Sequence, residues 1–236
     1  MSGVVLEARG LVKSFGRNQV LKGVDMSISS GDRYFLFGPN GAGKTTLVKL
    51  LTGLMKPDSG EVRLFGERLE GEALAIRARI GFLSHEPYLY GELTAMENLD
   101  FFGQLYNVPD RADRSKALLK EVGLFARSHD RVATFSRGMK QRLGLARAIL
   151  HEPDLVVLDE PYTGLDIRAS ATLERLIREK SVGGTAFLAI THDLAQGLEM
   201  ATRAGILSGG KMVLENDASG WDEFSERYLD VMGGGR

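Results

Sequence analysis

Gly38-Pro39-Asn40-Gly41-Ala42-Gly43-Lys44-Thr45-Thr46 is the stretch that decides the fold of this 236-residue chain. It fits the pattern G-x-x-x-x-G-K-[ST], in which backbone N–H groups surround the phosphates of a nucleotide. Residues 34–37 before it are apolar enough for a buried strand, and residues 45–52 after it have the character of a helix. A strand, a glycine-rich loop and a helix in this order are the setting of a phosphate-binding loop. We therefore predict a phosphate site at residues 38–46.

The residue types in this loop suit phosphate chemistry. Glycine permits positive φ and a close approach of the backbone to a ligand, and the start of a helix adds partial positive charge. We expect Lys44 to reach the β- and γ-phosphates and the Thr45 hydroxyl to hold Mg²⁺. The alternative is a glycine-rich turn that contains a lysine by chance. Such a turn would not need a strand before it and a helix after it.

The composition limits the class of protein. A hydrophobic content of 43% and a charged content of 26% are typical of a soluble globular chain. The net charge of −1 gives no basic field that would attract nucleic acid, so we expect no nucleic-acid partner. The chain has no cysteine, which excludes disulfides and thiolate metal sites. Apolar runs such as residues 186–190 are far shorter than the ~20 residues that span a bilayer, so any membrane role should come through a partner.

Strands and helices alternate over the second half of the chain. Apolar strands are predicted at residues 155–158, 186–190 and 204–208, separated by helices at residues 167–180 and 194–201. Buried strands that alternate with helices imply a parallel sheet covered on both faces. The predicted fold class is therefore α/β, with a phosphate-loop core.

Two other kinds of structure accompany this core. Residues 4–9 and 20–28 alternate like strands and predict an N-terminal antiparallel β subdomain. Residues 93–150 are helical in character, and Thr94 with Glu97 fits a capping box at a helix start. We therefore predict an inserted α-helical subdomain.

The predicted domain organisation follows from these elements. The main domain covers residues 1–216, and the helical subdomain is inserted into it at about residues 87–151. Residues 217–236 are predicted to form a C-terminal amphipathic appendage.

Two acids end the strand predicted at residues 155–158. At the carboxyl edge of a parallel sheet, Asp159 can meet the Mg²⁺ held by Thr45, and Glu160 can polarise an attacking water. An Asp-Glu pair can also begin a loop after any strand. The phosphate loop in the same sheet favours the catalytic interpretation.

His192 follows the strand predicted at residues 186–190 and should reach the same edge of the sheet. A lone histidine is usually structural or solvated. In this place a neutral imidazole can contact the γ-phosphate and hold the water or Glu160 in position. His129 and His151 have no such context, and we expect both at the surface.

Ser136 and Gly138 lie at the start of the helix predicted at residues 137–150. Ser136 is a good N-cap, and Gly138 lets a ligand approach the backbone closely. An ordinary capped helix fits these residues as well. As a phosphate binder this helix start would be a second site, whereas the chain has one phosphate loop. That mismatch suggests two copies, each offering the helix start to the nucleotide of the other.

The order of these motifs resembles the ATP-binding-cassette (ABC) ATPases from about residue 4 to residue 215. The matching stretches are residues 38–46, 135–142, 155–160, 164–166 and His192. The resemblance implies a head-to-tail dimer with two ATP molecules and Mg²⁺ between the subunits. It also implies that the helical subdomain docks on integral membrane transporter subunits, which would place the chain in the cytoplasm at the inner face of the membrane.

The resemblance further implies roles for single residues. Glu160 would be the catalytic base, His192 the switch histidine, and Asp166 a signalling residue between the two sites. Phe15 stands where the family places an aromatic ring that stacks on adenine, although a core residue at a strand end would fit the sequence too.

The chain departs from the family after the strand predicted at residues 80–83, where His85 stands in place of the usual glutamine. Imidazole can ligate a metal, but magnesium prefers oxygen, so a metal role for His85 stays one of two alternatives. The change to His85, followed by residues 93–99, is similar to the ATPase subunits of haem exporters used in cytochrome c biogenesis.

We therefore predict an ATP-hydrolysing subunit of a membrane transporter, with export as the direction. The alternative is a non-transport ABC ATPase that acts as a switch on nucleic acid or ribosomes. A single cassette, the absence of a heptad run and the net charge of −1 count against it. An unrelated phosphate-loop enzyme, such as a nucleotide kinase, would leave residues 136–142 and His192 without explanation.

Overall fold

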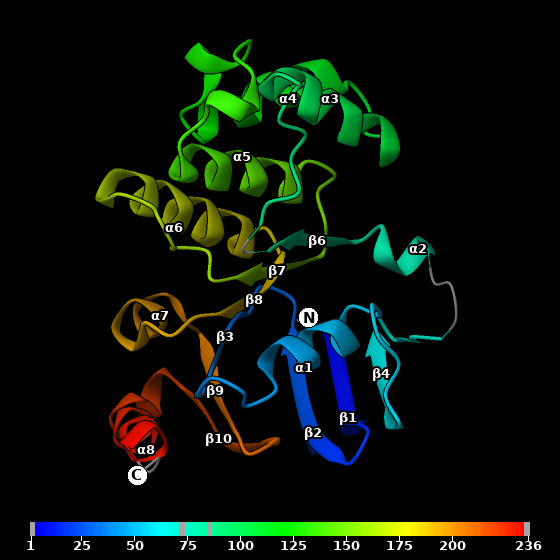
Figure 1. The fold of residues 1–236 in the computed structure, drawn as a ribbon, viewed down its shortest axis with the longest axis vertical. Helices are drawn as coiled ribbons and strands as arrows, with labels where there is room; N and C mark the ends of the chain where they lie inside the picture. Colours follow the sequence, from blue (N-terminus) through cyan, green and yellow to red (C-terminus); the bar gives the residue numbers. More distant parts are fainter. Residues whose placement is uncertain (1–2, 71–73, 85, 234–236) are drawn as a thin grey trace.

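The chain forms two sheets and a group of helices at one end (Figure 1), and the computed structural model describes residues 3–70, 74–84 and 86–233. The elements of the first half are β1 (Val4–Phe15), β2 (Asn18–Ser29), β3 (Arg33–Phe37), α1 (Lys44–Leu51), β4 (Ser59–Leu64), β5 (Glu67–Arg68), α2 (Leu74–Arg77), β6 (Ile80–Leu83), α3 (Ala95–Leu105) and α4 (Arg111–Glu121). Those of the second half are η1 (Phe125–Arg127), η2 (Val132–Thr134), α5 (Arg137–Ile149), β7 (Leu155–Asp159), α6 (Ile167–Val182), β8 (Ala186–Ile190), α7 (Leu194–Met200), β9 (Arg203–Ser208), β10 (Lys211–Asp217), η3 (Ala218–Gly220) and α8 (Trp221–Gly233).

The larger sheet has the strand order β10-β9-β3-β8-β7-β6. Its strands from β9 to β6 pair in parallel, and β10 pairs antiparallel with β9. The smaller sheet has the order β2-β1-β4-β5 and is antiparallel. The predicted fold class, a parallel sheet covered by helices beside an antiparallel β subdomain, is confirmed.

The parallel sheet separates two hydrophobic cores because successive side chains of a strand point to opposite faces. In β3, Tyr34 and Leu36 belong to the core that α1 shares with the antiparallel sheet. Phe35 and Phe37 belong to the other core, which α5, α6 and α8 cover. Figure 1 shows α1 between the two sheets, and its apolar residues Leu47, Val48, Leu50 and Leu51 are buried.

The helical group consists of α3, α4 and α5 with the short helices η1 and η2, at the top of Figure 1. The predicted capping box at its first helix is present. The Thr94 hydroxyl accepts a hydrogen bond from the Glu97 amide, 3.2 Å away, and the Glu97 carboxylate accepts one from the Thr94 amide at 2.8 Å. These bonds satisfy two amides that a helix start leaves without partners.

The last helix, α8, is amphipathic. Phe224 and Tyr228 are buried against the parallel sheet, whereas Leu229 and Met232 are exposed. The predicted appendage at residues 217–236 therefore contains a helix that packs onto the core.

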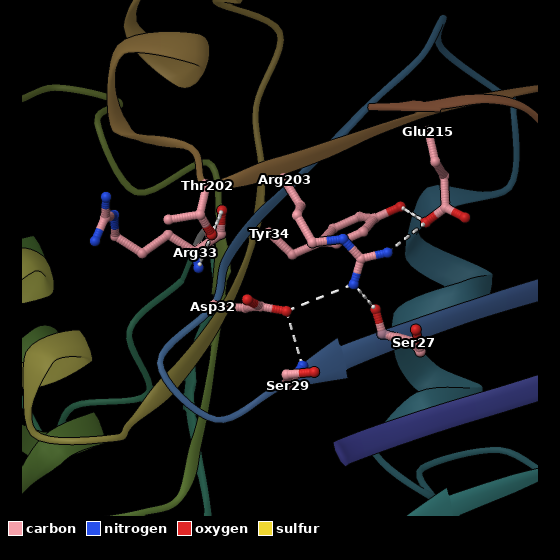
Figure 2. A network of polar contacts seen from close by, with 8 residues as sticks. All are labelled: Ser27, Ser29, Asp32, Arg33, Tyr34, Thr202, Arg203 and Glu215. Carbon is pink, nitrogen blue, oxygen red and sulfur yellow. Dashed lines mark hydrogen bonds and ion pairs between the residues drawn. The ribbon is translucent and has the colours of Figure 1, made fainter. Parts of the chain in front are cut away.

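An arginine network joins the two sheets (Figure 2). The guanidinium of Arg203, on β9, donates to the Ser27 carbonyl of β2 at 2.8 Å and lies 3.5 Å from the Asp32 carboxylate. It also lies 3.9 Å from the Glu215 carboxylate of β10 and over the Tyr34 ring, while the Tyr34 hydroxyl donates to Glu215. One side chain thus connects β2, β3, β9 and β10.

The prediction that His151 is a surface residue is wrong, whereas His129 is exposed as expected. The His151 ring stacks on Tyr106 with 4.0 Å between ring centroids, and its Nε2 lies 3.3 Å from the Ile80 carbonyl. Burial, aided by the charge of Arg147, lowers the pKa of His151 to about 4, and the Ile80 carbonyl opposes this shift. Tyr106, at the end of α3, therefore covers one face of the His151 ring, which the sequence pattern places at an exposed helix end.

This pKa predicts acid-sensitive stability. Between pH 6.5 and pH 4 the unfolded chain binds a proton at His151 and the folded chain does not, so stability is lost as the pH falls. The His151→Phe variant keeps the stack on Tyr106. Between about pH 7 and pH 5, we expect its free energy of unfolding to fall by about 2 kcal/mol less than that of the parent. Urea unfolding at several pH values measures this. His129→Phe is the control that should retain the full pH dependence, and an unchanged pH dependence in His151→Phe would contradict the prediction.

Candidate nucleotide-binding site

The loop between β3 and α1 has the backbone of a phosphate cradle. Gly38 has φ 147° and Gly43, at the N-cap of α1, has φ 105°. A Cβ atom at Gly38 would lie 2.1 Å from the Leu207 carbonyl oxygen of β9. Only glycine fits there, because both the positive φ and the close approach exclude a side chain.

Lys44 begins α1 and lies across the loop. Its Nζ donates to the carbonyl oxygens of Gly38 at 2.6 Å and Pro39 at 3.0 Å. Burial lowers the pKa of the Lys44 ammonium, and the negative charges of Glu160 and Asp159 partly oppose this shift. The cation therefore lies between the loop and the two acids at the end of β7.

A pocket of about 570 Å³ opens beside the loop. Most of the predicted site residues line it, together with two others: Phe15, Val20, Asn40, Gly41, Ala42, Gly43, Lys44, Thr45, Thr46, Asp159, Glu160 and Ile190. Phe15 comes from the end of β1 and is 49% exposed, so it is not a core residue. An exposed ring at the rim of a phosphate pocket suits stacking on a nucleotide base.

Asp159 and Glu160 reach the pocket because β7 ends beside β8 in the parallel sheet. Asp159 is the last residue of β7 in register with Ile190, and the Glu160 amide donates to the Ile190 carbonyl at 2.9 Å. Glu160 has φ 50°, a left-handed conformation that is unfavourable for a residue with a side chain. The surrounding sheet maintains this conformation in the residue between the strand end and the following loop.

The structure brings His192 to Glu160. The distance between His192 Nδ1 and the Glu160 carboxylate is 2.9 Å, and the histidine side chain is 77% exposed while that of Glu160 is 24% exposed. A carboxylate only accepts hydrogen bonds, so Nδ1 carries a proton in this pair. In the neutral ring, Nε2 is then an acceptor that faces outward for a water molecule or another polar group.

Three predicted site residues lie elsewhere. Ser136 caps α5 and accepts from the Met139 amide at 3.3 Å, while Asp166 caps α6. A Cβ atom at Gly138 would lie 3.0 Å from the Gly164 carbonyl oxygen, so the start of α5 approaches the loop before α6. None of Ser136, Gly138 and Asp166 lines the pocket of its own chain.

One predicted site residue falls outside the described residues, and two residues that line the pocket were not predicted as site residues. His85 lies outside the described residues. Val20 and Ile190 line the pocket, although the sequence pattern indicates only that they belong to strands. Val20 also lies within 3.2 Å of the position of a Cβ on Gly43, so this β2 side chain packs against the phosphate loop. Apolar strand residues carry no chemical signal that would have distinguished these two.

Comparisons with known proteins agree with this geometry. A family model described as ABC transporter matches residues 21–163. The daunorubicin resistance ATP-binding protein DrrA3 of Streptomyces coeruleorubidus is 36% identical over 92% of this chain and 70% of its own length. The bacitracin transport ATP-binding protein BcrA of Bacillus licheniformis is 34% identical over 96% of this chain and 74% of its own length.

A solved structure of the ATP-binding subunit of an ABC transporter superposes with a TM-score of 0.89. It is 30% identical in sequence and covers 97% of this chain and 99% of its own. The likeness extends over both sheets and the helical group.

Proposed function

This chain belongs to the ATP-binding subunits of ABC transporters, which bind and hydrolyse ATP to power transport, and we propose that its reaction uses Glu160 and His192 beside the phosphate loop. The observation that carries the proposal is the 2.9 Å contact between these two side chains at the edge of the loop pocket. Its relatives are transport and resistance subunits, which favours a transporter over a switch on nucleic acid.

We place the phosphates of ATP in the loop of residues 38–46 and the adenine against Phe15. The glycine backbone provides amide donors, and α1 adds the partial charge of its N-terminus. The Lys44 ammonium, which bonds loop carbonyls in this structure, would turn to the β- and γ-phosphates.

We propose Thr45 and Asp159 as the ligands of Mg²⁺. Both line the loop pocket, and their hydroxyl and carboxylate oxygens are the donors that Mg²⁺ prefers. When bound, the metal neutralises charge on the β- and γ-phosphate oxygens.

In the proposed hydrolysis, the oxygen of a water molecule attacks the γ-phosphorus while the Glu160 carboxylate takes a proton from that water. The bond from that phosphorus to the bridging oxygen of the β-phosphate breaks, and ADP and inorganic phosphate leave. The hydrogen bond from His192 Nδ1 to one Glu160 carboxylate oxygen, at 2.9 Å, keeps the other carboxylate oxygen turned toward the water.

We propose that Ser136 and Gly138 complete the site of a second copy in a head-to-tail dimer. They form a capped helix start that does not line the pocket of their own chain. The start of a helix favours anions, so in a partner it would face the γ-phosphate. Asp166, which caps α6 beside this helix start, would then lie between the two sites.

We propose that the helical subdomain at about residues 87–151 docks on integral membrane subunits at the cytoplasmic face. In this proposal it is an insertion into an ATPase core of residues 1–216, and it contains the helices α3, α4 and α5. Within the part of the chain that the structure describes, no helix combines the length and the apolar character needed to cross a bilayer.

For the cargo, we propose export of a small organic compound. Two similar relatives are named for daunorubicin resistance and bacitracin transport, and they match over more than nine-tenths of this chain. The resemblance of residues 93–99 to haem exporters involves far fewer positions, and His85, on which it also depends, lies outside the described residues.

Gene disruption in the source organism separates these two cargoes. We expect the disrupted strain to become more sensitive to daunorubicin or bacitracin, with unchanged covalent haem in its c-type cytochromes. Loss of that haem with unchanged antibiotic sensitivity would show instead that the haem-exporter prediction is right. Complementation with an Asp159→Asn variant is the control for a role of ATP hydrolysis, and it should fail to restore the original sensitivity.

A further inference from the structure

We propose that Tyr228 of the C-terminal helix α8 is a positioning residue for His192, and through it for Glu160. This inference rests on the proposed catalytic role of the His192–Glu160 pair. It adds a residue from the last helix of the chain to the machinery of hydrolysis.

The first observation is a contact to the main chain of the switch histidine. The Tyr228 hydroxyl donates to the His192 carbonyl oxygen at 3.3 Å. Tyr228 is 6% exposed, although it belongs to a helix with an open outer face. His192 lies between β8 and α7, where no regular element fixes its backbone, so an external hydrogen bond limits its position.

The second observation is how firmly the tyrosine ring is held. The Tyr228 ring packs edge-on against the Phe37 ring, with 5.8 Å between centroids. The Phe224 ring also packs edge-on against the Phe37 ring, with 5.6 Å between centroids. Phe37 is the last residue of β3 and directly precedes Gly38 of the phosphate loop. A Cβ atom at Gly197 of α7 would lie 2.5 Å from the Phe37 ring, so Phe37 also packs closely under the helix that follows His192.

The third observation concerns the protonation state of the Tyr228 hydroxyl. Burial raises the pKa of Tyr228, and the negative charges of Glu160 and Asp193 raise it further. The hydroxyl therefore stays protonated and remains a donor to the His192 carbonyl oxygen.

These contacts give Tyr228 a defined effect on the chemistry. The ring is anchored on the strand that leads into the phosphate loop, and the hydroxyl holds the residue that orients Glu160. The helix α8 thus sets the distance between the loop and the switch histidine. Without the hydroxyl, His192 can shift from Glu160 while the nucleotide pocket itself remains intact.

Steady-state ATP hydrolysis by the purified full chain tests the proposal. Tyr228→Phe removes the hydroxyl and keeps the ring, so we expect kcat to fall about fivefold, the equivalent of one ordinary hydrogen bond, with an unchanged KM for ATP. The melting temperature should stay close to that of the parent. Leu229→Ala, next to it on the exposed face of α8, is the matched control and should leave kcat unchanged.

A second variant separates positioning from a general structural role. In a His192→Ala background, Tyr228→Phe should cause no further loss, because the residue that it positions is gone. An equal loss in both backgrounds, or no loss in the parent, would overturn the proposal. If His192→Ala itself hydrolyses ATP at the parental rate, the proposed role of His192 fails, and the inference about Tyr228 fails with it. A loss in His192→Ala without one in Tyr228→Phe rejects the inference alone.

Discussion

Replacing Glu160 with Gln should lower ATP hydrolysis by about a thousandfold, the range of a lost general base, and leave ATP binding intact. The amide has the shape of the carboxylate, and its oxygen can still accept the His192 bond, which measures 2.9 Å in the parent. It cannot take a proton from water. Because ATP then stays uncleaved, the proposed dimer should accumulate with nucleotide bound.

Two measurements check this result: phosphate release under steady state, and size-exclusion chromatography with light scattering in the presence of ATP. Glu67→Gln, at an exposed position on β5, is the control and should behave like the parent. A Glu160→Gln variant that hydrolyses ATP within a few-fold of the parent would exclude Glu160 as the base. A variant that stays monomeric with ATP bound would contradict the head-to-tail dimer and leave the base assignment standing.

Replacing Lys44 with Ala should weaken ATP binding and lower hydrolysis by at least about a hundredfold, since a charge-assisted contact to the phosphates is lost. Lys44 lies across the loop, where its Nζ is within 3.0 Å of two carbonyl oxygens. Alanine also removes the positive charge that faces Asp159 and Glu160, so the acids would repel the incoming phosphates.

Isothermal titration with ATP measures the loss of binding, and phosphate release measures the loss of turnover. Lys49→Ala provides the matched control, because Lys49 is exposed in the last turn of the same helix α1. It should bind and hydrolyse ATP as the parent does. Equal binding of ATP by Lys44→Ala and Lys49→Ala would show that the loop is not the phosphate site.

The sequence predicted the position in the fold best for those residues at which local pattern and chemistry coincide. The loop at residues 38–46 has glycines where φ is positive, and its flanking strand and helix are strongly patterned. Glu160 and His192 were expected at one edge because each follows a strand of the parallel sheet. Their direct contact follows from that topology, since parallel strands bring their carboxyl ends together.

Residues whose environment depends on distant contacts could not be placed from the sequence. The sequence pattern places His151 at a helix end, and the stack with Tyr106, at the end of α3, is what half-buries it. Tyr228 likewise required knowledge of where α8 packs, because helical periodicity shows that a face is buried but not against what. The hydroxyl contact to His192 is invisible in the pattern of α8 alone.

The arginine network between the sheets has a consequence for how ATP is received. Phe15 and Val20, on the antiparallel sheet, line one side of the pocket, and the loop after β3 lines another. Arg203 connects β2 to β9 and β10, so a direct polar link joins the two sheets that carry these sides of the pocket. We expect this link to hold the two sides in place, so that the proposed nucleotide binds at little cost in reorganisation. In the proposed dimer, more of the free energy of ATP binding would then remain for bringing the two subunits together.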